Sequence, residues 1–219
     1  MKKVLFFIVG IIPVILLAQE NPFTDVFPIT DGKVNYTEVI QVENKNASEL
    51  YKNAKIWLVD AFKSSKDVIQ NDDRDNFIVI GKGFFDGYGH NKSITNAKYW
   101  FTIRIDCRDN RYKYTITDFI YEFDVTVLGI TTHYKEDFTK WGNVPFDTKF
   151  KELLDKKFPP NKERNAKQQQ KYEQYKNELD NELAEKYIER IERYSLLDSQ
   201  IKSIIDFLKK GIDKSDDNW

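Results

Sequence analysis

The stretch from Asn46 to Phe62 constrains the fold most, because it reads as one short amphipathic helix. Its apolar side chains follow the 3.6-residue period of a single helical stripe. The stripe consists of Leu50, Ala54, Trp57, Leu58, Ala61 and Phe62. Asn46 and Glu49 have the spacing of a capping box, in which both side chains bond free backbone amides of the first turn. The sequence therefore predicts a helix that begins at Asn46 and must cover an apolar surface.

Strands on both sides of this helix supply the surface. One strand precedes the helix and four follow it, and the first and last of them show alternating apolar and polar residues. They are predicted at residues 33–42, within 63–72, and at 77–85, 98–106 and 111–123. Asp109 and Asn110 form a two-residue hairpin turn between the last two strands. The order strand, helix, four strands predicts an α+β fold with a curved antiparallel sheet and helices on one face.

Two local features shape this sheet. Gly81 and Gly83 lie inside a strand, where glycine marks a bend or bulge that lets a curved sheet wrap a helix. The apolar parity of the last strand shifts around Asp118, which indicates a β-bulge there. The face away from the helix is expected to be wet. It carries Asn35, Thr37, Gln41, Trp100, Thr102, Arg104, Lys113, Thr115 and Thr117.

The remainder of the chain is predominantly helical. The weak pattern from residue 124 to 143 allows one further strand at 125–130, and a helix is predicted at 146–158, stopped by Pro159 and Pro160. A long amphipathic helix follows, with a break expected near Ser195 and Gly211 as its C-cap. We divide the chain into a signal peptide (1–18), a linker (19–30), an α+β domain (31–145), a C-terminal helical segment (146–212) and a tail (213–219).

The N-terminus has the features of a secretory leader. Lys2 and Lys3 precede an apolar run from residue 4 to 18, shorter than the roughly 20 residues of a membrane-spanning helix. We predict cleavage after Ala18, although Leu16 departs from the small-residue rule and leaves an uncleaved anchor as the alternative. We expect an exported protein, periplasmic or extracellular, without stable membrane insertion once the leader is removed.

Composition narrows the possible partners and chemistry. The formal net charge is -1, without the positive excess typical of nucleic-acid binders. Cys107 is the single cysteine, so no internal disulfide can form. It shares the parity of Ile103 and Ile105, which favours a buried apolar residue over the alternatives of a reactive thiol or an intermolecular pair.

Four segments together resemble a known family. They are FPITDGKVNYTEVIQV, ASELYKNAKIWLVDAF, FIVIGKGFF and YWFTIRIDCRDNRYKYTITDFIYEF, within residues 27–123. They resemble the domain of unknown function with a TBP-like fold found in exported proteins of Bacteroidetes. The resemblance implies a curved antiparallel sheet with helices on one face, and no known activity. The fold is similar to the DNA-bending TATA-binding protein, but the open face here reads as lacking the basic residues that would hold phosphates, and we expect no nucleic-acid partner.

A search for catalytic chemistry finds little. His90 and His133 are the only histidines, and no metal-binding spacing, nucleophile elbow or phosphate loop is present, so no metal and no cofactor are expected. Several carboxylates lie near strand ends, which keeps open a hydrolase of envelope polymers that uses paired acids. They are Asp72, Asp73, Asp75, Asp86 and Asp106, and solvated turn residues are the other interpretation.

Two places are candidate binding sites. One is a loop at the sheet edge whose aromatic residues can grip a ligand or a partner chain, or else include one core phenylalanine, Phe84 or Phe85, and a tyrosine that caps the sheet. Its residues are Phe84, Phe85, Tyr88 and His90. Trp100 and Arg104 on the open face have the chemistry to bind sugar or peptide, or else belong to a solvated face. We expect a non-catalytic module that binds an unknown protein or small ligand, with self-association through the long helix as a variant.

Overall fold

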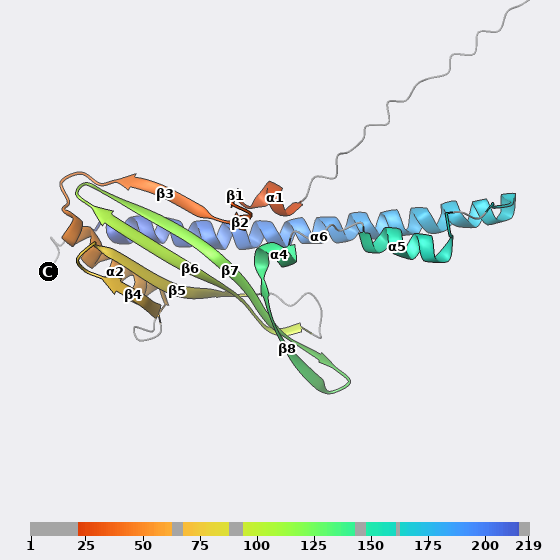
Figure 1. Ribbon diagram of the computed structural model, residues 1–219, viewed down its shortest axis with the longest axis horizontal. Helices are drawn as coiled ribbons and strands as arrows, with labels where there is room; N and C mark the ends of the chain where they lie inside the picture. Colours follow the sequence, from red (N-terminus) through yellow and green to blue (C-terminus); the bar gives the residue numbers. More distant parts are fainter. Residues whose placement is uncertain (1–21, 63–67, 88–93, 143–147, 161–162, 215–219) are drawn as a thin grey trace, which may run out of the picture.

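The computed structural model describes residues 22–62, 68–87, 94–142, 148–160 and 163–214, and its centre is one antiparallel sheet (Figure 1). The strands are ordered β3-β7-β6-β5-β4, and β8 also pairs with β7. Their bounds are β3 (Tyr36–Gln41), β4 (Ile69–Asp73), β5 (Ile78–Asp86), β6 (Ile94–Arg108), β7 (Arg111–Val127) and β8 (Ile130–Asp137). A separate two-stranded sheet joins β1 (Ile29–Thr30) to β2 (Lys33–Val34). The predicted fold class is confirmed, including the order strand, helix, four strands.

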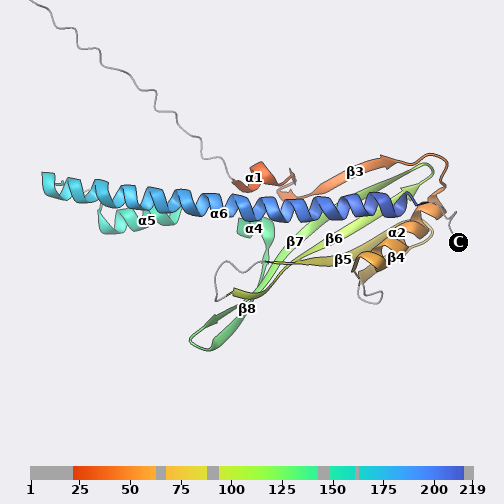
Figure 2. The same ribbon diagram turned by 180° about the vertical axis from the view of Figure 1, so that it is seen from behind.

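Helices cover one face of the main sheet. Helix α2 (Ala47–Phe62) and the C-terminal part of α6 (Ala166–Ile212) cover it, and α4 (Phe138–Gly142) packs on β7 and β8. Helices α1 (Pro22–Val26) and α5 (Thr148–Lys157) pack on α6. The sheet lies in front of α6 in Figure 1, and α6 lies in front of the sheet in the reverse view of Figure 2. The opposite face of the strands carries no helix in the described part of the chain. None of the helices in these ranges is both long and apolar enough to cross a membrane.

Helix α2 packs where its stripe predicted. Asn46 Oδ1 accepts a hydrogen bond from the Glu49 amide at 2.9 Å, while the Glu49 carboxylate pairs with Lys45 Nζ at 3.3 Å. A Cβ atom at Gly81 would lie 2.7 Å from Leu58 Cδ2, and one at Gly83 would lie 2.3 Å from Phe62 Cε1. The two glycines therefore let the helix approach the strand more closely than any side chain would allow.

The predicted turn and bulge are both present. Arg108 pairs with Arg111 across the Asp109–Asn110 turn, in which Asn110 has a φ of 58°. Farther along, Trp100 pairs with Ile120 but Thr102 pairs with Thr117, so β7 contains one extra residue. Asp118 lies at this bulge with a φ of 54°. The bulge restores the apolar parity of β7 toward the helices beyond this point.

Helix α6 belongs to the same core as the sheet. It runs without a break at Ser195 and ends at Ile212, so Gly211 is not the C-cap and instead packs against the Trp57 ring. Tyr36 on β3 donates a hydrogen bond of 2.6 Å to Asp198 Oδ1 on α6. The buried side chains of α6 that face the sheet include Tyr194, Leu197, Ile201, Ile205, Leu208 and Ile212. A helix of 47 residues extends about 70 Å, and its N-terminal part runs beyond the sheet beside α5 (Figure 1).

Two sequence predictions are corrected by the structure. The expected linker over 19–30 contains α1, and Phe23 and Phe27 are buried because their rings pack against Phe138 and Tyr194 from α4 and α6. The strand expected at 125–130 is wrong, because these residues span the turn between β7 and β8. Strand β8 carries no buried residue, so it lacks the alternating apolar pattern that would have revealed it.

Candidate functional site

The open face of the sheet is laid out by strand register, because residues paired across neighbouring strands point to the same side. Nearest the β6–β7 turn, Arg108 is opposite Arg111. In the next row Asp106 is opposite Lys113, and Arg104 lies in the row after that, beside Thr115. We call Arg104, Arg108, Arg111 and Lys113 the arginine patch. Its members converge on one face because the intervening residues point into the core.

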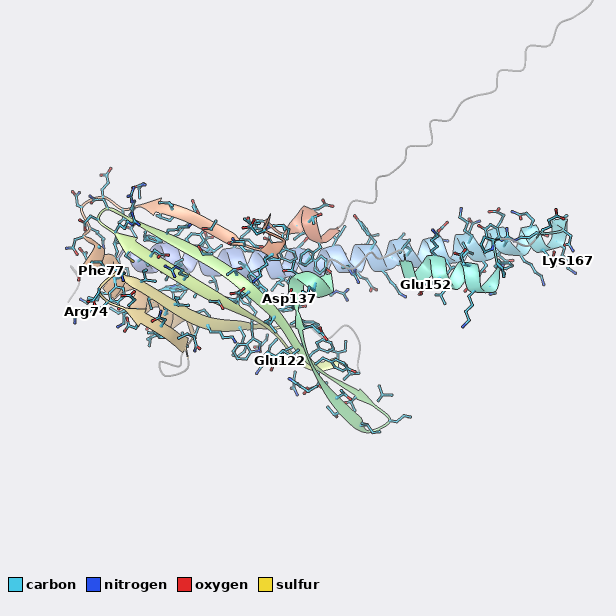
Figure 3. The ribbon with its side chains drawn as sticks, in the orientation of Figure 1. Arg74, Phe77, Glu122, Asp137, Glu152 and Lys167 are labelled. Atoms are coloured by element: carbon cyan, nitrogen blue, oxygen red, sulfur yellow. The ribbon has the colours of Figure 1, made fainter. Side chains whose placement is uncertain are left out.

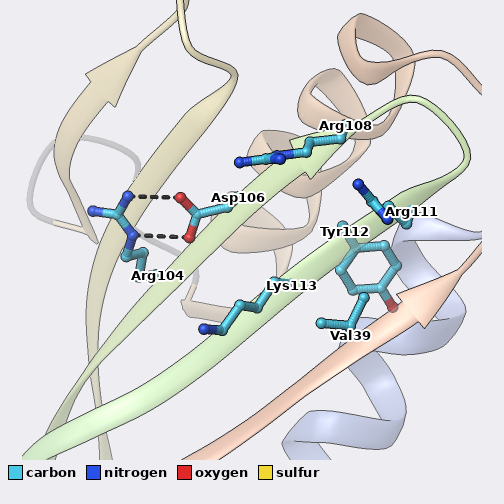
Figure 4. Close-up of a pocket in the computed structure, with 7 residues that line it drawn as sticks. All are labelled: Val39, Arg104, Asp106, Arg108, Arg111, Tyr112 and Lys113. Carbon is cyan, nitrogen blue, oxygen red and sulfur yellow. Dashed lines mark hydrogen bonds and ion pairs between the residues drawn. The ribbon is translucent and has the colours of Figure 1, made fainter.

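The arginine patch lines a pocket of about 440 Å³ (Figure 4). Arg104 holds Asp106 with two parallel bonds, Nε to Oδ2 at 2.8 Å and Nη2 to Oδ1 at 2.6 Å. This pairing raises the pKa of Arg104 above its ordinary value, chiefly through the hydrogen bonds from the guanidinium to the carboxylate. Asp106 is the one acidic residue among the described side chains that line the pocket. The pocket is therefore electropositive.

An aromatic cluster lies farther along the same face. The rings of Phe84 on β5 and Trp100 on β6 are 4.8 Å apart at their centroids. Lys98 Nζ lies 4.7 Å from the Phe84 centroid and Lys82 Nζ lies 5.6 Å from that of Trp100. Phe84 is 40% exposed even with these cations beside it. We call Lys82, Phe84, Lys98 and Trp100 the aromatic cluster, which presents both ring surface and positive charge.

The structure brings together only part of the predicted site. Trp100 and Arg104 both lie on the open face of β6. Phe85 lies on the opposite face, where its ring stacks on that of buried Phe101 at 4.9 Å. Tyr88 and His90 lie outside the described residues. Phe84, from the same predicted stretch, lies beside Trp100 on the open face, because neighbouring residues of a strand point to opposite faces.

From the sequence, Arg104 and Lys113 were the only cations expected on the open face, too few to hold phosphates, and that expectation is wrong. The register places six cations there: Lys82, Lys98, Arg104, Arg108, Arg111 and Lys113. The net charge of the chain hid them, because it averages over all faces of the molecule. Strand parity was the available signal, since Arg104 and Arg108 alternate with buried Ile105 and Cys107. The expected absence of a nucleic-acid partner stays a prediction.

Three of the carboxylates considered for catalysis, Asp72, Asp73 and Asp106, are each hydrogen-bonded to a different neighbouring residue. Asp72 faces the helices, where it accepts hydrogen bonds from Tyr51 and Lys55 on α2, whereas Asp106 faces the open side. Asp73 accepts hydrogen bonds from the Asn76 amide at 3.1 Å and from Asn76 Nδ2 at 2.8 Å. Within the described ranges, no three His, Cys, Asp or Glu side chains gather as a metal site. Asp73 and Asp106 share the open face, in the row Asp73, Ile78 and Asp106, but Asp73 is engaged by Asn76 and Asp106 by Arg104.

A second exposed feature is the end of the β7–β8 hairpin, which extends away from the rest of the sheet and which we call the arm (Figure 1). Its tip is apolar, with Leu128 98% exposed and Ile130 72% exposed. Asp124 Oδ1 lies 2.8 Å from His133 Nδ1 partway along the arm. The structure with side chains drawn places Asp137 and Glu122 near the base of the arm and Lys167 at the far end of α6 (Figure 3). The arm and the projecting part of α6 are thus separate from the open face.

Comparison with known proteins finds a matching family model and similar solved structures. Residues 36–122 match the family model of a domain of unknown function (DUF4468) with TBP-like fold. A solved TBP-like protein from Parabacteroides distasonis is similar at 15% identity and a TM-score of 0.46, covering 85% of this chain and 99% of that one. A solved DUF4468 family protein from Bacteroides ovatus is similar at 14% identity and a TM-score of 0.47, covering 89% and 94%. No curated protein matches the sequence. The family resemblance indicated by the sequence is confirmed, and it brings no known activity.

Proposed function

We propose that this TBP-like domain is a non-catalytic binding module that holds a ligand or a partner protein on the open face of its sheet. The observation that carries the proposal is the aromatic cluster, in which Phe84 and Trp100 are left on a face that no described helix covers. Ring faces flanked by lysines bind sugar rings, apolar side chains or anionic groups. The sheet beneath is continuous and buried on its other side, so the binding groups are held on a rigid platform.

The site of action in this proposal is the periplasm or the cell surface. The support is the N-terminal sequence, with two lysines followed by an apolar run that has the length of a signal peptide core. Export would place the open face in contact with envelope polymers and exported proteins. Fractionation of cells that express the full chain tests this point: recovery with cytoplasmic markers would contradict it.

A hydrolase is the weaker alternative. Paired-acid hydrolysis needs two carboxyl groups about 5 to 10 Å apart across one cleft. Asp106 is engaged by Arg104, and Asp72 is engaged on the other side of the sheet. These positions favour binding over catalysis as the role of the open face.

The test is capture of ligands or partners from the native envelope by immobilised protein. Trp100→Ala and Arg104→Ala should reduce capture, and thermal melts should confirm that each variant is folded. Ile56→Ala is the matched control, because Ile56 is 49% exposed on α2, away from the open face. Equal capture by wild type, Trp100→Ala and Arg104→Ala would exclude this face as the binding surface.

Self-association through α6 is a variant of the proposal. Its projecting part carries an apolar stripe that includes Leu183, Tyr187 and Ile191, all partly exposed, beside the more exposed Ile188. A second copy would cover this stripe. Light scattering at high protein concentration tests the idea, and a monomeric mass would contradict it.

A further inference from the structure

We propose that the arginine patch is a binding site for a phosphate-type oxyanion carried by the ligand of the open face. The inference rests on the proposed function in that it names the chemistry of one end of the same surface. Arg108, Arg111 and Lys113 are the residues that would contact the anion. Arg104 would form the wall of the site, because it is already engaged by Asp106.

The arginine patch places like charges next to each other. Arg108 and Arg111 are directly opposite each other in the antiparallel ladder, on the same face. Like charges in this position destabilise a sheet, whereas an opposite charge between them stabilises it. Lys113 adds a third cation in the adjacent row. An anion at this position would therefore relieve a repulsion that the fold contains.

The acidic residues near Arg108, Arg111 and Lys113 are hydrogen-bonded to other groups. Both oxygens of Asp106 face Arg104 at 2.6 and 2.8 Å. Asp109, in the turn between the two arginines, accepts a hydrogen bond of 2.8 Å from the Ala47 amide at the start of α2. Across the described chain, the ion pairs that the structure forms include none with Arg108, Arg111 or Lys113. Three positive charges are thus left for an external partner.

The arginine patch also has the geometry of a binding site. These side chains line an open pocket of about 440 Å³, and Figure 4 shows the arginines on the two neighbouring strands β6 and β7. The adjoining residues Cys107 and Tyr112 are 2% and 1% exposed, so the backbone that carries the patch is anchored in the core. Guanidinium groups bind phosphate oxygens through paired, planar hydrogen bonds. A dianion compensates three cations better than a single carboxylate does, which favours phosphate over a carboxylate ligand.

The position of the patch also limits the shape of the ligand. Arg108 lies eight residues from Trp100 along β6, a separation of about 27 Å for an extended strand. A ligand that uses both ends of the face must therefore be elongated, with the anionic group over the arginines and a ring or apolar group over the aromatic cluster.

The experiment is an NMR titration of the full chain with inorganic phosphate, compared with acetate at constant ionic strength. Phosphate should shift the backbone signals of residues 108–113 and bind more tightly than acetate. The double variant Arg108→Gln/Arg111→Gln should weaken phosphate binding by about tenfold or more, because it removes two charge-assisted contacts. Lys171→Ala/Lys176→Ala removes the same charge from exposed positions of α6 and should bind phosphate as wild type does.

A phosphate group can come from a soluble ligand or a lipid headgroup, and vesicles separate the two. Binding to phosphatidylcholine vesicles only when they contain phosphatidic acid would support the site with a headgroup as source, and binding of free phosphate alone would support a soluble source. Absence of phosphate binding, equal affinity for acetate, or equal loss in the lysine variant would overturn the proposal. The titration is independent of capture. Loss of capture in Trp100→Ala with no phosphate binding rejects only this inference. Phosphate binding with capture unaffected in both Trp100→Ala and Arg104→Ala rejects only the proposed function.

Discussion

Truncation of Trp57 should cost this protein a large part of its stability. The Trp57 side chain is 2% exposed and packs between its own helix, α2, and α6. Its ring centroid lies 6.0 Å from that of Phe62 and 6.0 Å from that of Phe207. A Cβ atom at Gly211 would lie only 2.5 Å from Trp57 Cδ1, so the α6 backbone packs directly on the indole. The buried Nε1 has no hydrogen-bond partner among the described residues, so the loss is one of packing and burial alone.

The expected loss for Trp57→Ala is about 3 to 5 kcal/mol in the free energy of unfolding. The upper part of this range applies, because the glycine that contacts the ring has no side chain to fill the void. Domains have a total stability of about 5 to 15 kcal/mol, so the variant should unfold at a much lower urea concentration. With an m-value of about 2 kcal/mol/M, the midpoint falls by about 1.5 to 2.5 M.

Urea titration followed by far-UV circular dichroism measures this midpoint. Ile56→Ala is the control, because Ile56 is the neighbouring residue of the same helix and is 49% exposed. Its effect should stay within about 0.5 kcal/mol. A loss below about 1 kcal/mol in Trp57→Ala would refute the view that α2 and α6 are joined through a shared core.

Three further predictions follow from single contacts. A double-mutant cycle of Tyr36→Phe and Asp198→Ala should give a coupling of about 1 to 3 kcal/mol in urea titrations, since both remove one buried hydrogen bond, and additive effects would contradict it. Burial raises the pKa of the Cys107 thiol to about 12, so a thiol reagent at pH 8 should label it only in denaturant; rapid labelling of the native protein would show the site is open. The Lys55 ammonium, followed by Tyr51, holds the pKa of Asp72 below its ordinary value of 3.8, so its stabilisation is complete above pH 3.8 and is lost as the pH falls through the lowered pKa. Asp72→Asn should therefore make unfolding less dependent on pH below about 4, and an unchanged acid titration would contradict this.

The sequence predicted the elements that bury an apolar face. The α2 stripe, the Asp118 bulge and the close approach at Gly83 each leave a local signal, because burial on one side imposes a period on the residues. Strand β8 leaves no such signal, since it pairs with β7 beyond the helices and buries nothing. Its two-residue mirror-image turn has positive φ at both Leu128 and Gly129, at 51° and 80°, and leucine is not a residue type that predicts such a turn.

Contacts between residues that are distant in sequence could not be predicted from local sequence patterns. The buried bond between Tyr36 and Asp198 joins residues far apart in the chain. The apolar stripe of α6 marks the face that is buried, but no local pattern says that this face meets the sheet. The same holds for Phe23, which read as part of a linker because its partners, Phe138 and Tyr194, come much later. Register across strands likewise decided the site. It brought Arg108 opposite Arg111 on the open face and turned Phe85 toward the core.

The central claim, which the self-association variant would replace, is that the open sheet face meets the ligand or partner. A photo-crosslinking residue in place of Thr102 tests it directly, because Thr102 lies on β6 between Trp100 and Arg104. The same residue in place of Lys171 probes the exposed, projecting part of α6. After irradiation of the native envelope, the account predicts a discrete crosslinked product from position 102 and none from position 171. Products from position 171 alone, or equal products from both, would contradict it.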